Sequence, residues 1–65
     1  MRIQVNGSWR EVPSAALAAA LADLGYGDAV ITTAVNGEFV ASEARQRTLL
    51  ADGDRLEVLA PMQGG

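Results

Sequence analysis

The sequence predicts an α+β domain in which a mixed sheet of about five strands packs against one main helix. Two short apolar segments carry Asn-Gly pairs, at residues 6–7 and 36–37, and each is typical of a β-hairpin. An Ala/Leu-rich segment between them, residues 15–24, predicts the helix, and an alternating segment at residues 55–60 adds a last strand. Two hairpins, one helix and one strand in 65 residues indicate a single α+β unit.

The first hairpin contains a local conflict. Residues 2–5 alternate polar and apolar side chains, and residues 9–12 form the return strand. A two-residue turn at Asn6-Gly7 pairs Ile3 with Arg10 and turns the arginine toward the core. We therefore expect a longer loop here; the alternative is a short turn at an open edge of the sheet.

The helix is expected to begin after Ser14, whose hydroxyl is suited to accept a hydrogen bond from a backbone N–H of the first turn. Its leucines recur at i, i+4 and i+7 and predict one core-facing stripe: Leu17, Leu21 and Leu24. Gly25 is expected to end the helix in a left-handed conformation. Tyr26 follows, and we expect it to cover the core.

The second hairpin is predicted from residues 30–35, which are rich in β-branched side chains, and from the return strand 38–40. Phe39 is expected to fill the core. Residues 42–47 are polar and suggest a short helical turn capped by Ser42.

After it, Leu49 and Leu50 are expected to return to the core, and residues 52–54 (DGD) form a tight turn. The acidic groups at this turn lack the regular ligand spacing of a calcium site, so no metal site is predicted.

The last strand is predicted to place Leu59 on the outer face of the sheet, beside Arg55 and Glu57. The opposite side chains face the core: Leu56, Val58 and Ala60. Pro61 lacks a backbone N–H and ends the strand ladder. We therefore expect a folded domain over residues 1–60 and a flexible tail over 61–65.

Composition excludes several classes of function. The chain has no cysteine, histidine or lysine, which removes disulfides, thiolate metal sites and the usual general base. All five basic residues are arginines, and the net charge of −3 argues against nucleic acid. No apolar segment is long enough to span a membrane and no signal peptide opens the chain, so a cytoplasmic location is expected by default.

The end of the chain is the candidate functional segment. Gly64 and Gly65 lack a Cβ, so they can pass through a narrow channel and adopt backbone angles closed to other residues. A terminal carboxylate on such a tail is a group that another enzyme can reach, activate and modify.

Four segments of the chain, in their order and spacing, resemble a known family: the Leu-bearing helix, residues 34–40 (AVNGEFV), residues 50–54 (LADGD) and the Gly-Gly end. On these segments the whole chain resembles the ThiS family of sulfur carriers of thiamine biosynthesis. One departure lies at residues 41–43 (ASE), where the family often carries a proline or a basic residue. The resemblance implies the ubiquitin-like β-grasp fold, in agreement with the predicted elements.

The resemblance also implies that partner enzymes perform the chemistry, so this chain is expected to be a carrier and not an enzyme. An E1-like adenylating enzyme (ThiF-type), using ATP and Mg²⁺, would join the Gly65 carboxylate to AMP. A sulfur donor such as a cysteine desulfurase persulfide would then yield a thiocarboxylate for thiazole synthase (ThiG-type). No cofactor is expected on this chain.

The residues that serve this chemistry fall into two groups. Gly65 carries the sulfur, and three residues thread the tail into the partner: Gly64, Gln63 and Met62. The partner is expected to dock near the tail, on Leu59, Glu57 and Asp54, with Asp52 adding negative charge for steering.

Three other functions remain open. A sulfur carrier of molybdopterin synthesis has the same fold and the same Gly-Gly end, although such proteins tend to be longer. A protein modifier would use the same adenylate to form isopeptide bonds with lysines. A plain interaction module, with an incidental Gly-Gly end, is the third.

Overall fold

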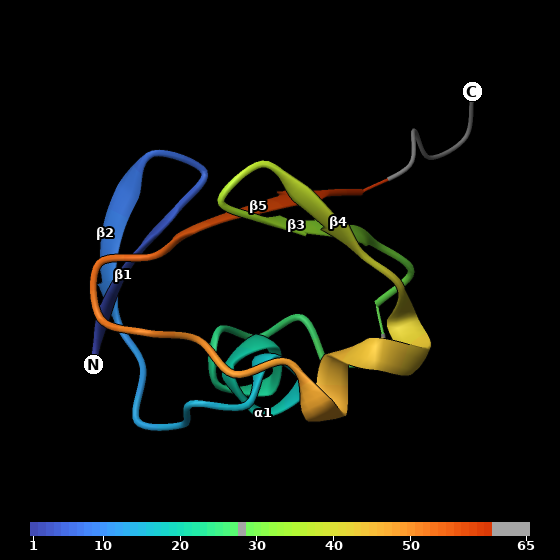
Figure 1. The fold of residues 1–65 in the computed structure, drawn as a ribbon, viewed down its shortest axis with the longest axis horizontal. Helices are drawn as coiled ribbons and strands as arrows, with labels where there is room; N and C mark the ends of the chain where they lie inside the picture. The colour runs from blue at the N-terminus through green and yellow to red at the C-terminus, as the bar shows by residue number, and fades with distance from the viewer. Residues whose placement is uncertain (28, 61–65) are drawn as a thin grey trace.

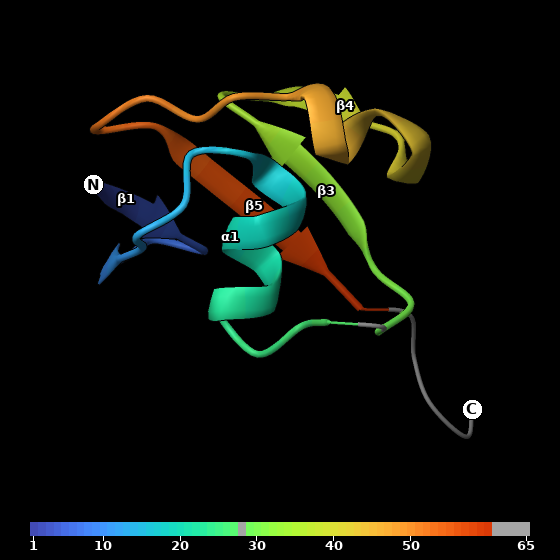
Figure 2. The same ribbon diagram turned by 90° about the horizontal axis from the view of Figure 1, so that it is seen from below.

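A computed structural model describes residues 1–27 and 29–60 and confirms the α+β class. In this part of the chain, one five-stranded sheet carries one α-helix on one face (Figures 1 and 2). The elements in chain order are β1 (Arg2–Val5), β2 (Ser8–Glu11), α1 (Leu17–Asp23), β3 (Thr32–Val35), β4 (Glu38–Val40), the 3-10 helix η1 (Ser42–Arg47) and β5 (Arg55–Leu59). The predicted tail lies outside the described residues.

The sheet is mixed because its last strand enters the centre. The strand order is β2-β1-β5-β3-β4, with β5 parallel to β1 and antiparallel to β3. The two hairpins therefore form the two halves of the sheet, and β5 joins them. Figure 2 shows α1 lying across β5.

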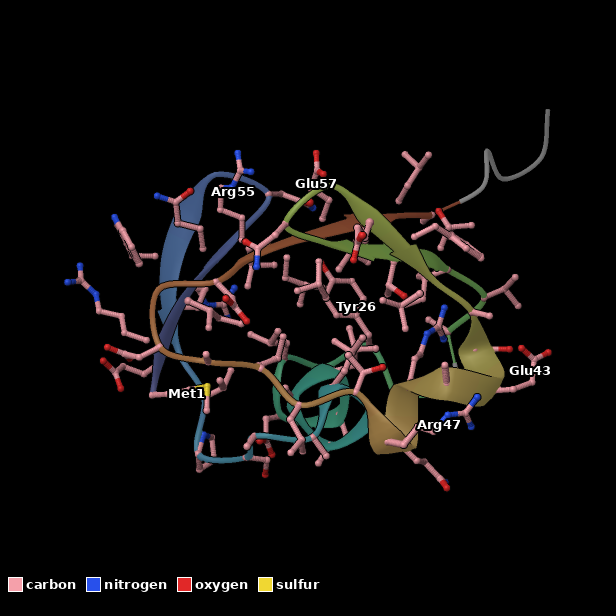
Figure 3. All side chains as sticks on the ribbon, in the orientation of Figure 1. Met1, Tyr26, Glu43, Arg47, Arg55 and Glu57 are labelled. Atoms are coloured by element: carbon pink, nitrogen blue, oxygen red, sulfur yellow. The ribbon has the colours of Figure 1, made fainter. Side chains whose placement is uncertain are left out.

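The core lies between α1 and the sheet. Leu17, Ala20 and Leu21 are buried on the helix, which confirms the predicted leucine stripe, and Leu24 is partly buried beside them. Tyr26 packs against this core and lies between sheet and helix in Figure 3, as expected. The other buried apolar side chains come from the strands and connections: Ile3, Val5, Val12, Leu50, Leu56 and Val58.

The longer first loop predicted from the sequence is wrong. Asn6 and Gly7 form a two-residue turn with φ angles of 50° and 87°, and Ile3 pairs with Arg10. The conflict disappears because β2 is an edge strand whose four residues are all exposed. Arg10 shares a face with Ile3 but lies where the helix does not cover the sheet.

Neither predicted serine cap forms, and α1 begins later than expected. The residue before α1, Ala16, is extended and pairs with Leu49. Around it, the Leu17 N–H donates to the Thr48 carbonyl (2.8 Å) and the Leu50 N–H to the Ala15 carbonyl (2.7 Å). The bond from the Leu17 N–H thus satisfies a backbone donor at the start of the helix for which a Ser14 cap was predicted. Ser42 instead lies inside η1, which begins after Ala41 without a side-chain cap.

The end of α1 agrees with the prediction. Gly25 has a φ of 94°, and its N–H donates to the Ala22 carbonyl (3.0 Å). The Tyr26 N–H donates to the Leu21 carbonyl (2.8 Å), which completes a Schellman motif. This turn directs the chain back over the core.

Three apolar residues predicted in the core are exposed instead. Phe39 is 70% exposed because the two-residue turn at Asn36-Gly37 pairs it with Ala34, on the face away from α1. Leu49 is 72% exposed, since the extended pairing there buries only Leu50. Ala60 is exposed because β5 ends at Leu59.

Two turn asparagines hold β5 in the sheet. The Asn6 amide accepts from the Val58 N–H (2.8 Å) and donates to the Val58 carbonyl (3.1 Å), so it extends the β1–β5 ladder beyond the end of β1. The Asn36 amide accepts from the Arg55 N–H (3.0 Å) and donates to Asp54 Oδ1 (3.0 Å). Both residues have positive φ angles, which Asn tolerates better than most residues.

Leu21→Ala is expected to lower the free energy of unfolding by about 2–5 kcal/mol, because it leaves a cavity under the sheet. Leu49→Ala makes the same chemical change at an exposed site and is expected to alter it by less than about 0.5 kcal/mol. Urea titration followed by circular dichroism measures both. Equal midpoints for the two variants would contradict the packing described here.

Asn6→Ala is expected to lower the free energy of unfolding by about 1–3 kcal/mol, since it removes both bonds to Val58 and Ala tolerates a positive φ angle less well than Asn. Asn6→Gly removes the same bonds but keeps the favourable backbone, and should cost less. The same urea titration separates the contribution of the hydrogen bonds to Val58 from that of the backbone conformation at residue 6. An alanine variant as stable as wild type would mean that the amide does not hold β5.

Candidate functional site

The tail residues predicted to carry and thread the sulfur lie outside the described residues: Met62, Gln63, Gly64 and Gly65. The structure instead defines the surface from which the tail departs. The last described residue, Ala60, follows directly after β5, so the outer face of the sheet at the end of β5 is the candidate site.

An apolar surface lies on this outer face, on the side of the sheet away from α1. Leu59 is 70% exposed, as its predicted outward position requires, and Phe39 is exposed to the same extent. Leu59 on β5 pairs with Thr32 on β3, and Phe39 on β4 pairs with Ala34 on β3. The two large side chains therefore come from the strands on either side of β3, which itself contributes small ones.

The difference in side-chain size leaves a hollow, here called the tail-base hollow. Ala34 lies at its centre between Phe39 on β4 and Glu57 on β5. The hollow has a volume of about 340 Å³ and is lined by Asn6, Thr32, Thr33, Ala34, Phe39, Glu57, Val58 and Leu59. Its shape and apolar walls suit a side chain or a short segment from another molecule.

The acidic docking candidates differ in their surroundings. Glu57 is exposed and lines the tail-base hollow, and Figure 3 shows it on the outer face beside Arg55. Asp54 Oδ2 accepts from the Ala51 N–H (2.8 Å), and its Oδ1 accepts from Asn36, so this carboxylate stabilises its own turn. Asp52 Oδ1 similarly accepts from the Arg2 N–H (2.7 Å). Docking through these groups stays a prediction.

Phe39 is the site residue that sequence reasoning missed. Its apolar side chain suggested the core, but the turn carries the decisive signal. A two-residue Asn36-Gly37 turn pairs Val35 with Glu38 and therefore Ala34 with Phe39. Val35 faces the core side, so Ala34 and Phe39 face outward. Counting register from the turn would have placed Phe39 on the same face of the sheet as Leu59.

A second hollow, on the α1 side, has a structural role. Arg45 lines it, and its guanidinium donates to the Ile31 carbonyl (2.8 Å) and to Thr33 Oγ1 (3.2 Å). Thr33 Oγ1 in turn donates to the Val40 carbonyl (2.8 Å). These bonds fasten η1 to the second hairpin, and the arginine is thereby engaged within the fold.

The described residues offer a contact surface with little chemistry of its own. Within residues 1–27 and 29–60, no group of three or more acidic side chains is placed to hold a metal ion. No helix in the same range is long and apolar enough to cross a membrane. The tail-base hollow presents hydroxyl, amide and carboxylate groups beside apolar walls, a composition suited to recognition.

Comparison with known proteins agrees with this geometry. The model of the ThiS family matches residues 3–65, and no curated protein matches the chain. The crystal structure of the thiamine biosynthesis protein ThiS from Geobacter metallireducens is 35% identical, with a TM-score of 0.80 and full coverage of both chains. The expected β-grasp arrangement is confirmed by this likeness, and the chain belongs to the ThiS family.

Proposed function

We propose that this chain is a sulfur carrier of thiamine biosynthesis whose Gly65 carboxylate is converted to a thiocarboxylate. The observation that carries the proposal is the ThiS family match, which extends through Gly64 and Gly65. The likeness to a thiamine biosynthesis protein over both full chains supports the thiamine pathway over the molybdopterin one. The apolar outer face at the end of β5 supports a role that depends on docking.

The first step activates the Gly65 carboxylate, which is a poor electrophile at neutral pH. An oxygen of the Gly65 carboxylate attacks the α-phosphorus of ATP in an adenylating enzyme, pyrophosphate leaves, and Mg²⁺ offsets phosphate charge. The acyl-adenylate has AMP as its leaving group. The terminal sulfur of a cysteine persulfide attacks the carbonyl carbon and AMP departs. A second thiol then cleaves the S–S bond, giving the thiocarboxylate and a disulfide.

The thiocarboxylate is the form that would supply sulfur to thiazole synthase. The carrier contributes the reactive carbon, the tail and the docking surface. Its sequence holds no histidine, cysteine or lysine, so the carrier supplies only its terminal carboxylate, and the acid, the base and the sulfur nucleophile belong to the partners.

The length of the tail limits where a partner can bind. Five residues follow Ala60, and a fully extended chain spans at most ~3.4 Å per residue, or roughly 17 Å. The adenylation site of the partner must lie within that distance of the end of β5. A partner that reaches Gly65 therefore comes close to the tail-base hollow, where Phe39 and Leu59 are available for contact.

Mass spectrometry tests the proposal directly. The chain is isolated from its own host, and trypsin cleavage after Arg55 releases residues 56–65. Replacement of one C-terminal oxygen by sulfur is the expected result. A C-terminus linked to lysines of other proteins would make the chain a modifier. A plain carboxylate, even with ATP, sulfur donor and host extract supplied, would leave an interaction module.

Gly64→Ala is expected to abolish adenylation, because the added Cβ obstructs the narrow channel that must admit the tail. ATP–pyrophosphate exchange by the adenylating enzyme measures this step. Leu49→Ala changes an exposed residue outside the tail and is expected to retain activity. If Gly64→Ala were adenylated as fast as wild type, threading through a narrow channel would be disproved.

Leu59→Arg is expected to raise the KM of the adenylating enzyme for the carrier by about tenfold or more, because it removes an apolar contact of the docking face. Leu49→Arg introduces the same charge at an equally exposed leucine outside this face and serves as the control. Equal KM values for the two variants would place the docking surface elsewhere.

A further inference from the structure

The outer face of the sheet has a second part, at the end opposite the tail. Trp9, Gln4 and Arg55 are neighbours on β2, β1 and β5 in one row across the sheet. Their side chains face away from the core, since Ile3, Val5 and Leu56 point the other way. The Arg2 guanidinium carbon lies 4.7 Å from the centroid of the Trp9 ring. Arg2, Trp9 and Arg55 are here called the basic end of the outer face.

The two arginines of the basic end differ from those of η1. Arg45 donates to Ile31 and Thr33, and Arg47 donates to the Glu43 carbonyl (3.2 Å). Arg2 and Arg55 form hydrogen bonds through their backbone N–H groups, while their guanidinium groups bond to no other described residue. A guanidinium has five donors in a planar fork, so both retain their full capacity to bind a carboxylate.

Trp9 adds an apolar platform to this charge. It is 48% exposed on an edge strand, although an indole ring is among the side chains that gain most from burial. The Arg2 guanidinium lies over the Trp9 ring, and this cation–π contact favours a position of the charge above the indole. Exposed Trp and Arg side chains together are the residues most enriched in the energetic centres of protein interfaces.

The neighbouring charges restrict the ligand. Glu11 lies opposite Arg2 in the β1–β2 pair, and Glu57 follows Arg55 by two residues on the same face. The net charge of the whole chain is −3. A nucleic acid has a dense row of phosphates and would be repelled by these carboxylates. A protein segment with one or two carboxylates can instead contact the guanidinium groups of Arg2 and Arg55 without approaching Glu11 or Glu57.

We propose that the basic end binds an acidic segment of the adenylating enzyme, while the tail-base hollow receives an apolar one. This inference rests on the proposed function and adds the chemistry of the partner surface. The two contacts lie at opposite ends of one sheet face, and β5 contributes Arg55 to the basic end and Glu57 to the tail-base hollow (Figure 3). A partner with matching acidic and apolar regions fits in one orientation only, which directs the tail toward its active site.

Calorimetric titration of the purified adenylating enzyme with carrier variants tests this inference. Arg2→Glu/Arg55→Glu is expected to weaken binding by about tenfold, and increasing salt should weaken binding of the wild type more than that of the variant. Arg10→Glu is the matched control, because Arg10 lies on the same hairpin but shares the opposite face with Ile3. It is expected to bind nearly as wild type, and urea titration verifies that all three proteins are folded.

Each other outcome overturns the inference. Equal affinity of Arg2→Glu/Arg55→Glu and wild type would show that the basic end is not used. An equal loss with Arg10→Glu would reduce the effect to overall charge. Tighter binding of single-stranded DNA than of the enzyme would assign the surface to a polyanion. If the double variant binds the adenylating enzyme as tightly as wild type does, and the wild-type carrier still gains sulfur, only this inference is overturned. If the wild-type carrier neither binds the adenylating enzyme nor gains sulfur, the proposed function is overturned.

Discussion

The rest of the structure depends on the pairing of β5 with a strand on each side. β5 is the last strand in sequence and the central strand in space, parallel to β1 and antiparallel to β3. Without it the two hairpins share no hydrogen-bonded edge. Asn6 and Asn36 add side-chain bonds to its backbone from both sides. The tail therefore departs from the segment whose backbone is held most completely, and its origin is fixed relative to the whole outer face.

The same strand determines which side chains the outer face presents. Leu56 and Val58 are buried against the helix side, and a strand alternates its faces, so Arg55, Glu57 and Leu59 must point outward. Core packing and the composition of the outer face are thus set by one register. A shift of β5 by one residue would bury two charges and expose the core, so the outer face cannot change register while the domain remains folded.

Much of this arrangement follows from sequence periods, and the errors have a common physical origin. Alternation in residues 55–59 correctly placed Leu59 outward, and helical spacing correctly buried Leu17 and Leu21. Phe39 was misplaced because its apolar character was given more weight than the register of a two-residue turn. The long first loop and the Ser14 cap failed for a similar reason. Edge exposure of β2 and the Ala16–Leu49 bridge are long-range facts that override local preference. For the tail, the sequence predicts only the chemistry of its terminal carboxylate, and residues 61–65 lie outside the described residues.

Phe39 and Leu59 are exposed although burial of either side chain would stabilise the domain. Burying such a side chain typically contributes about 1.5–3 kcal/mol, a large share of the stability of a domain this small. In the described residues the buried apolar core amounts to nine side chains, yet two large ones are exposed to water on the outer face near the end of β5. Stability alone would favour polar residues at these positions. Their placement on one face, within reach of a five-residue tail, is what a carrier needs when another protein must hold it during reaction.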